Sequence, residues 1–302
     1  MKHFSPLENI KCITKVEKID LKKSISPHFS SEFKKKIIGQ LKTVEVYKIV
    51  YRVKKLSIVG YIVLPKVGDD LPCLLHLRGG SGDFGMITPK GIIGNMLPYA
   101  AEGYAVITTQ YPGVDGGDGA DSFGGEDDLL CIKKLRDILK ALPSVDEKVL
   151  GVKGHSRGGL MGYMLLREVR WVKAAMCSAA PTDQVDRTGD RAGWKDHQKR
   201  MWGGDRAGAL KRSPIRWVDE LPRKVPLLIM QGSADWRVLP RHSFAMVDEL
   251  QKRSHPHRFI FFEGADHQIS EYRQEYHRQT IDWFNRWLKN KEPLPNMKPH
   301  GK

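Results

Sequence analysis

The chain has 302 residues, enough for one large domain or two small ones. Hydrophobic residues make up 40% and aromatic residues 9%, so the chain can build a sizeable core, and a mostly disordered protein is excluded. Lys and Arg number 50 against 35 Asp and Glu, giving a formal net charge of +15. Such a charge raises the question of whether the chain binds nucleic acid or an anionic surface, or is an enzyme on a basic scaffold.

The first 43 residues are predicted to form a basic N-terminal arm that is irregular and partly helical. Residues 1–60 hold 14 Lys and Arg against 5 Asp and Glu, so most of the excess charge lies near this end. The segment SSEFKKKIIGQL is predicted as a helix with Ser30 or Ser31 as its N-cap. The sequence leaves open whether the arm orders the domain, mediates a homo-oligomer or wraps over a pocket.

Targeting, redox and metal signals are weak throughout the chain. No apolar run approaches the roughly 18 to 20 residues that span a bilayer, and the start lacks the apolar core of a signal peptide. The four cysteines are far apart in the sequence and form no C-x-x-C pair. We therefore expect a cytoplasmic protein with no transmembrane segment, no disulfide framework, no metal and no cofactor.

Residues 44–302 alternate strand-like and helix-like segments. VEVYKIVYRV and LSIVGYIVLP, separated by two lysines, are predicted as an antiparallel hairpin at one edge of a sheet. Short, nearly continuous apolar runs follow and are typical of strands buried on both faces of a parallel sheet: PCLLHL, YAVITTQ, KVLGVKG, VKAAMCSA, VPLLIMQG and HRFIFFEG. Helical segments are predicted at 125–142, 243–254 and 275–290. The pattern predicts an α/β fold with a mostly parallel sheet and helices on both faces.

A G-x-S-x-G motif, Gly154-His155-Ser156-Arg157-Gly158, lies between a predicted strand and a predicted helix. On such a tight turn the serine backbone is strained, and the glycines keep side chains out of the space between strand and helix. The serine hydroxyl then lies at the helix N-terminus, where N–H groups favour developing negative charge. Ser156 is therefore the predicted nucleophile. The alternative is a glycine-rich turn with an ordinary N-cap serine.

Two further residues complete a predicted catalytic triad in the chain order typical of α/β hydrolases. Asp235 comes just after the strand VPLLIMQG, and His267 comes just after the strand HRFIFFEG. We expect His267 to take the Ser156 proton and Asp235 to fix the tautomer of its ring. Asp266 is also acidic, but an immediate neighbour does not easily reach Nδ1 of the same ring, so a turn role is expected for it.

The loop after PCLLHL is the predicted oxyanion loop. It contains paired glycines, whose backbone N–H groups can approach a substrate oxygen. The predicted donors are the N–H of Gly79 or Gly80 and that of Arg157, the residue after the nucleophile. The sequence does not decide which glycine N–H points inward, and a simple tight turn is the alternative.

The stretch from about Val44 to Leu288 resembles the catalytic domain of the prolyl oligopeptidase family of serine peptidases. The resemblance rests on several motifs in register: IVGYIVLPK, RGGSGDFG, QYPGVDGGDG, LPSVDEKVLGVKGHSRGG, RSPIRWVDELPRKVPLLIMQGSADWRV and FFEGADHQIS. It implies an α/β-hydrolase fold and triad roles for Ser156, Asp235 and His267. It also implies hydrolysis of a small peptide or ester substrate through an acyl-enzyme.

The sequence also departs from that family. Its long members carry a β-propeller ahead of the hydrolase domain, for which about 44 residues leave no room, and the usual His-Gly-Gly-Pro is Arg78-Gly79-Gly80-Ser81 here. A carboxylesterase is therefore the alternative to a peptidase. An insert at 181–212 is predicted to cover the site. The candidate pocket residues are Arg78, Tyr111, His155, Trp194, Trp202 and Trp236. The two insert tryptophans could equally pack the insert, and a packing role is expected for His155.

A nucleic-acid or anionic-surface binder is the distant alternative, based only on the basic arm. The chain has no zinc knuckle, helix-turn-helix or aromatic RNA-binding strand that would favour this class. The block Lys34 to Lys36 is typical of a solvated helix face. An inactive hydrolase fold is a third reading, and the complete, correctly ordered triad argues against it.

Overall fold

The computed structural model describes residues 6–186 and 192–301. The chain divides into two compact units. The first comprises the described residues of Met1–Asp121 and Glu126–Leu150, and the second those of Ser122–Gly125 and Gly151–Lys302. Neither unit corresponds to the predicted arm or to the predicted catalytic domain. The predicted division into residues 1–43 and 44–302 stays a prediction. Residues 187–191, inside the predicted insert, lie outside the described residues.

Among the described residues the strands form one nine-stranded sheet in the order β1-β2-β3-β5-β4-β6-β7-β8-β9. The first unit holds the following elements: β1 (Ile13–Lys18), α1 (Ser31–Thr43), β2 (Val44–Val53), β3 (Leu56–Pro65), β4 (Leu71–Leu77), α2 (Pro89–Asn95), α3 (Leu97–Ala100), β5 (Ala105–Thr109) and α4 (Glu126–Lys140). Strand β6 (Val145–His155) contains the boundary between the two units.

The predicted hairpin is confirmed as β2 and β3, which pair antiparallel from Val44 opposite Pro65 to Val53 opposite Leu56. Lys54 in the two-residue turn has a positive φ of 52°. β3 also pairs antiparallel with β5, whereas β5 pairs parallel with β4. The hairpin therefore joins the parallel part of the sheet through β3.

The N-terminal segment differs in part from its prediction. The helix α1 is confirmed, and its N-cap is Ser30, whose hydroxyl accepts a hydrogen bond from the N–H of Phe33 at 3.2 Å. The expectation of irregular chain before it is wrong for Ile13–Lys18, because these residues form β1 and pair antiparallel with β2. The hairpin was predicted at the edge of the sheet, but the edge strand there is β1. ITKVEK has little apolar alternation because an exposed edge strand buries little of either face.

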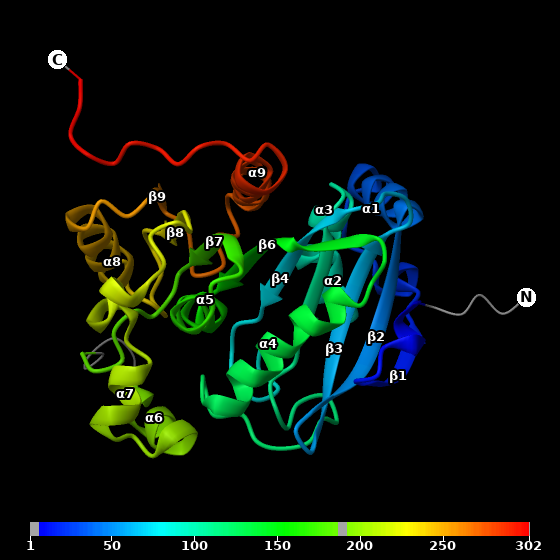
Figure 1. Ribbon diagram of the computed structural model, residues 1–302, viewed down its shortest axis with the longest axis horizontal. Coiled ribbons are helices and arrows are strands. Elements are labelled where there is room, and N and C mark those ends of the chain that lie inside the picture. The colour runs from blue at the N-terminus through cyan, green and yellow to red at the C-terminus, as the bar shows by residue number, and fades with distance from the viewer. Residues whose placement is uncertain (1–5, 187–191, 302) are drawn as a thin grey trace, which may run out of the picture. The chain divides into compact units, whose positions relative to one another are not determined.

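The second unit holds the remaining elements, which Figure 1 shows as helices around short strands. They are α5 (Arg157–Glu168), β7 (Val172–Ser178), α6 (Trp194–Trp202), α7 (Arg206–Lys211), β8 (Leu227–Gly232), α8 (Arg241–Lys252), β9 (His257–Phe262) and α9 (Arg273–Phe284). β8 pairs parallel with both β7 and β9. Short 3₁₀ turns and a π-helical turn at Asn285–Lys289 complete the described chain.

Helices cover both faces of β6 in this unit. A Cβ added at Gly151 would meet Phe284 of α9, while one added at Gly162 of α5 would face the side chain of Val152. Successive strand residues point to opposite faces, so α5 and α9 lie on opposite faces of β6. The predicted α/β class, with a mostly parallel sheet and helices on both faces, is confirmed.

The two edge strands have different surfaces. β1 carries lysines and a glutamate and is mostly exposed. β9 carries Phe259 and Phe261, whose rings contact Phe244 of α8 at centroid distances of 5.7 and 5.1 Å. Phe244 and Phe261 are 47% and 41% exposed, so this aromatic cluster is not covered. Within 6–186 and 192–301, no helix is both long and apolar enough to cross a membrane.

Candidate active site

Ser156 lies on a strained turn between β6 and α5. Its backbone has φ 57° and ψ −125°, in a region that residues other than glycine rarely adopt. Its N–H donates to the carbonyl of Ser178 at 2.8 Å, which holds the turn against the end of β7. A Cβ on Gly154 would lie 2.1 Å from the carbonyl oxygen of Gly158, so the strand-to-helix approach requires glycine there. Ser156 is also the N-cap residue of α5.

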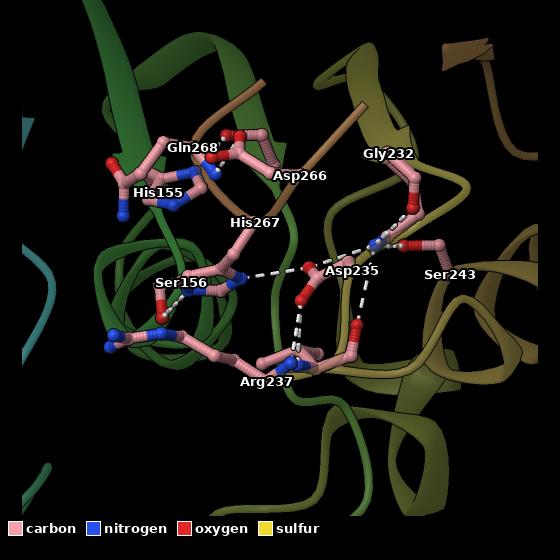
Figure 2. A network of polar contacts seen from close by, with 12 residues as sticks. His155, Ser156, Gly232, Asp235, Arg237, Ser243, Asp266, His267 and Gln268 are labelled. Carbon is pink, nitrogen blue, oxygen red and sulfur yellow. Dashed lines mark hydrogen bonds and ion pairs between the residues drawn. The ribbon is translucent and has the colours of Figure 1, made fainter. Parts of the chain in front are cut away.

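The three residues predicted as a triad come together in the second unit (Figure 2). His267 Nε2 lies 3.0 Å from Ser156 Oγ, and His267 Nδ1 lies 2.7 Å from Asp235 Oδ2. A carboxylate only accepts hydrogen bonds, so Nδ1 carries the proton and Nε2 accepts from the serine hydroxyl. The Asp235 side chain is fully buried and that of His267 is 7% exposed. Contacts in this order are what a nucleophile, a base and an orienting carboxylate would require.

The carboxylate of Asp235 is held by the turn that follows β8. Its Oδ1 accepts the backbone N–H groups of Arg237 and Val238, each at 2.9 Å. Its Oδ2 accepts from His267 and also from Nε2 of Gln231 at 3.0 Å. Sequence reasoning missed Gln231. The only signal was a polar residue at the buried end of an otherwise apolar strand.

Asp266 has the turn role expected of it. Its Oδ1 accepts the N–H groups of Gln268 and Ser270 at 2.8 and 3.0 Å, so the carboxylate closes the loop after β9. This turn directs the ring of the next residue, His267, toward Ser156. The side chain that reaches Nδ1 of His267 is that of Asp235.

His155 packs behind the ring of His267, with 4.8 Å between the ring centroids. Its Nδ1 lies 3.0 Å from Ser178 Oγ, which in turn lies 3.0 Å from the hydroxyl of Tyr276 on α9. Burial holds the pKa of His155 well below its usual value, and the nearby cationic or titratable groups of His267, Arg273 and Lys153 lower it further. The His155 ring is therefore neutral at physiological pH.

Lys153, also on β6, is a second buried titratable group close to His155. Burial, with a further contribution from Arg273, lowers its pKa to about 7. A lysine in this environment is partly neutral near pH 7. Sequence reasoning did not single it out, because a lysine inside a strand pattern normally points to solvent.

An aromatic cluster contacts the side chain of Arg157, the residue that follows Ser156. Phe123 of the second unit contacts Trp194, His197 and Trp202 at centroid distances of 5.7, 5.2 and 5.8 Å. The buried guanidinium of Arg157 lies 4.7 Å from the centroid of the Phe123 ring. Trp194 and Trp202, the two tryptophans of the predicted insert, thus both contact Phe123. The sequence analysis did not single out Phe123, because it lies in a glycine-rich loop.

The side chain of Arg212 ties the insert to the loop that carries Phe123. Its guanidinium donates to the carbonyls of Ser122, Phe123 and Gly208 at 3.0, 2.8 and 3.0 Å. It also lies 4.7 Å from the centroid of the Trp202 ring. Trp236, in contrast, is exposed beside Asp235, and its ring faces the guanidinium of Arg237.

The predicted oxyanion loop belongs to the first unit. The buried side chain of Arg78 donates to the carbonyls of Gly79, Gly82 and Phe84 at 3.2, 2.9 and 3.4 Å, and its guanidinium lies 4.6 Å from the centroid of the Tyr111 ring. Tyr111 donates its hydroxyl to the carbonyl of Arg78 at 2.9 Å. The arginine thus braces its own loop. The oxyanion and pocket roles expected of Arg78, Gly79, Gly80 and Tyr111 stay predictions.

Comparisons with known proteins give two family matches. The sequence model of Peptidase_S9, the prolyl oligopeptidase family, matches residues 95–291. That of AXE1, acetyl xylan esterase, matches residues 17–130. The curated relatives include the uncharacterized peptidase YtmA of Bacillus subtilis (strain 168), 26% identical over 253 residues, which are 82% of this chain and 95% of the relative. They also include dipeptidyl-peptidase 5 of Porphyromonas gingivalis, 25% identical over 77% of this chain and 36% of the relative.

Solved structures share the fold at low sequence identity. The acylaminoacyl peptidase of Pyrococcus horikoshii aligns with a TM-score of 0.74 and 19% identity over 88% of this chain and 45% of its own. Acetyl xylan esterase 1 of Thermoanaerobacterium sp. JW/SL YS485 aligns with a TM-score of 0.62 and 17% identity over 91% and 90%. The chain thus spans less than half of that acylaminoacyl peptidase and nearly all of that esterase.

Proposed function

This chain belongs to the prolyl oligopeptidase family and is a serine hydrolase, and on that premise we propose that it cleaves peptide, amide or ester bonds through an acyl-enzyme on Ser156. The observation that carries the proposal is the hydrogen-bonded line from Ser156 Oγ through His267 to the buried Asp235 carboxylate. A nucleophile, a base and an orienting group within hydrogen-bond reach are what this chemistry requires.

The proposed first step is acylation of Ser156. His267 Nε2 takes the hydroxyl proton as Oγ attacks the carbonyl carbon of the substrate. Asp235 holds the Nδ1 proton and stabilises the imidazolium, and the imidazolium then protonates the departing amine or alcohol. In the second step a water molecule gives a proton to His267 Nε2 and attacks the acyl carbon. The Oγ–acyl bond breaks, the imidazolium gives the proton to Oγ, and the carboxylic acid is released from the regenerated serine.

The negative charge on the tetrahedral carbonyl oxygen needs hydrogen-bond donors. We assign one to the backbone N–H of Arg157, since it lies in the first turn of α5, where N–H groups point out of the helix start. For the second donor, the N–H of Gly79 or Gly80 stays the prediction made from the sequence. Removing one such donor typically lowers kcat by about 10²- to 10³-fold.

The acyl or leaving-group side of the substrate is proposed to contact the aromatic cluster of Phe123, Trp194 and Trp202. The support is that Arg157 joins this cluster directly to the nucleophile. Trp202→Ala should then raise KM more for esters with aromatic acyl groups than for acetyl esters. An equal change for both would leave the cluster with a packing role only.

Peptidase and carboxylesterase are the two candidate activities. The peptidase reading is supported by the prolyl oligopeptidase match and by relatives named as peptidases. The esterase reading is supported by the acetyl xylan esterase match and by an esterase structure of similar length. Turnover of p-nitrophenyl esters and of aminoacyl-arylamides, measured side by side on the full chain, decides between them.

The test of the nucleophile is covalent labelling with a fluorophosphonate. The wild-type chain should be labelled on Ser156, and Ser156→Ala should abolish labelling. Ser233→Ala is the matched control, because Ser233 is an exposed serine of the same unit whose hydroxyl accepts from the N–H of Gly264. Labelling that persists in Ser156→Ala contradicts the proposal.

A further inference from the structure

Gln231 is a fully buried amide at the end of β8. Its Nε2 lies within hydrogen-bond distance of three acceptors: Asp235 Oδ2 at 3.0 Å, the carbonyl of Gly232 at 3.2 Å and the carbonyl of Val238 at 3.3 Å. Its Oε1 accepts from the hydroxyl of Ser243 on α8 at 2.8 Å. Figure 2 labels the partners Asp235, Gly232 and Ser243.

These contacts determine which way the amide points. An amide carbonyl only accepts hydrogen bonds, so a flipped Gln231 would turn Oε1 toward the Asp235 carboxylate and two backbone carbonyls. Such a flip would place the amide oxygen against three other acceptors and remove the Gln231 donor from each of them, which is costly at a buried position. The Ser243 hydroxyl adds a donor on the opposite side. The N–H groups of Gln231 are therefore fixed toward Asp235.

We propose that Gln231, oriented by Ser243, is a positioning residue that holds the Asp235 carboxylate in place for His267. The inference rests on the proposed function and assigns a further residue to it. Asp235 Oδ2 accepts from both Gln231 and His267, while Oδ1 accepts two backbone N–H groups. These four donors use the acceptor positions of the carboxylate, so the Asp235 side chain cannot turn to a different orientation without losing hydrogen bonds.

A second consequence concerns the charge on Asp235 Oδ2. A donor on this oxygen draws negative charge away from the hydrogen bond to His267, because both donors share one acceptor atom. Without the Gln231 donor, the carboxylate would stabilise the protonated ring of His267 more strongly. His267 would then act as a base only at higher pH. A residue that merely filled space would not produce this change.

Two other titratable groups lie next to the His267 ring, namely His155 against it and Asp266 in the same loop. Lys153 and Arg273 interact with His155. Substitutions at Gln231 and Ser243 leave all four groups in place. The pH dependence of Ser156 reactivity therefore reports the change at Asp235. Its acid limb is the fall in the rate of fluorophosphonate labelling as the base becomes protonated.

The experiment measures the second-order rate constant for fluorophosphonate labelling of Ser156 against pH in the full chain. Gln231→Met removes the amide donor and keeps a side chain of similar length. We expect its rate constant to fall about tenfold at neutral pH, and the midpoint of its acid limb to rise by about 0.5 pH unit. Ser243→Ala should change both in the same direction but less, by about threefold in rate.

The double variant Gln231→Met/Ser243→Ala tests the connection between the two residues. If Ser243 acts only through the amide, the double variant should match Gln231→Met rather than show the product of both effects. Gln279→Met is the matched control, because Gln279 also donates its amide to a carboxylate, that of Glu275 on α9, which is not one of the triad residues. It should leave the rate and the midpoint unchanged.

Each negative outcome identifies what has failed. If the wild-type chain is not labelled on Ser156, the proposed function falls and this inference falls with it. If the wild type is labelled but folded Gln231→Met keeps its rate and midpoint, only the positioning role is overturned. Should Gln231→Met not fold, Ser243→Ala decides, since an unchanged midpoint in that variant overturns the role equally. Multiplicative effects in the double variant exclude Ser243 as the residue that orients the amide.

Discussion

Gly154 is a position where the structure predicts a large effect of a single added methyl group. In Gly154→Ala the new Cβ would lie 2.1 Å from the carbonyl oxygen of Gly158, 2.3 Å from its carbonyl carbon and 2.7 Å from the nitrogen of Gly159. All three are backbone atoms of the first turn of α5, so no side-chain rotation relieves the overlap. The strand β6 and the helix α5 must separate instead.

The size of the effect follows from these distances. Real Cβ atoms essentially never approach other heavy atoms within 3.0 Å, so the closest contact must open by about 0.9 Å. Overpacking a core typically costs about 1–3 kcal/mol, and we expect about 3–5 kcal/mol here because the obstacle is backbone. A similar shift of Ser156 would break its 3.0 Å contact with His267. Misplacement by about 1 Å costs about 10²-fold in rate.

Two measurements check this prediction, namely urea unfolding followed by circular dichroism and the rate of fluorophosphonate labelling. Gly39→Ala is the control, since Gly39 lies in the exposed part of α1 and a Cβ there meets nothing within 4 Å. That variant should be more stable by about 0.5–1 kcal/mol, because alanine favours the helix. A Gly154→Ala protein that unfolds within about 1 kcal/mol of wild type and is labelled at the wild-type rate refutes the reasoning.

Three further predictions concern titratable or charged side chains of the second unit. The lowered pKa of Lys153, about 7 in the folded state against 10.5 for the ordinary side chain, means that the unfolded state binds more protons between these values. Stability should therefore rise by about 1.4 kcal/mol per pH unit in this window, and Lys153→Met should remove that slope in urea unfolding. The pKa of His155 is also lowered, so its contribution is present above pH 6.5 and is lost below it. His155→Gln should lose less stability than wild type between pH 6.5 and 5, and an identical loss would contradict the assignment. Arg212→Lys keeps the positive charge but loses the planar guanidinium group that donates to the carbonyl of Phe123. It should lower the free energy of unfolding by about 2 kcal/mol. A variant as stable as wild type would show that these guanidinium hydrogen bonds do not contribute to stability.

Much of the fold could be predicted because its strands follow simple periodicities. The alternation of VEVYKIVYRV and the continuous apolar run of VPLLIMQG correspond to β2 and to the completely buried β8. Structural neighbours and the observed sheet agree on the predicted α/β-hydrolase fold. Strand β1 could not be predicted, since an edge strand owes its conformation to pairing with β2 rather than to a buried face.

The arrangement of the candidate site was predictable where local backbone geometry places its residues. The strained turn of Ser156 and the positions of Asp235 and His267 after strand ends have local sequence signals. Gln231 and Phe123 have none, because their roles depend on partners that folding brings together from Asp235, Ser243 and the insert. Sequence motifs and their order along the chain predict residues that follow a strand or a turn. They do not predict residues whose roles depend on contacts with distant parts of the chain.

The difference between the two edge strands bears on how the folded protein behaves at high concentration. Lys15 and Lys18 on β1 oppose the approach of a second positively charged copy, and charge of this kind is a common protection against unwanted strand addition. β9 has one exposed basic residue, Arg258, which alternates onto the opposite face from Phe259 and Phe261, and an incoming strand would cover aromatic surface there. Self-association of folded molecules should therefore begin at β9. The substitution Phe261→Lys should therefore extend the range of protein concentrations that can be used in solution experiments.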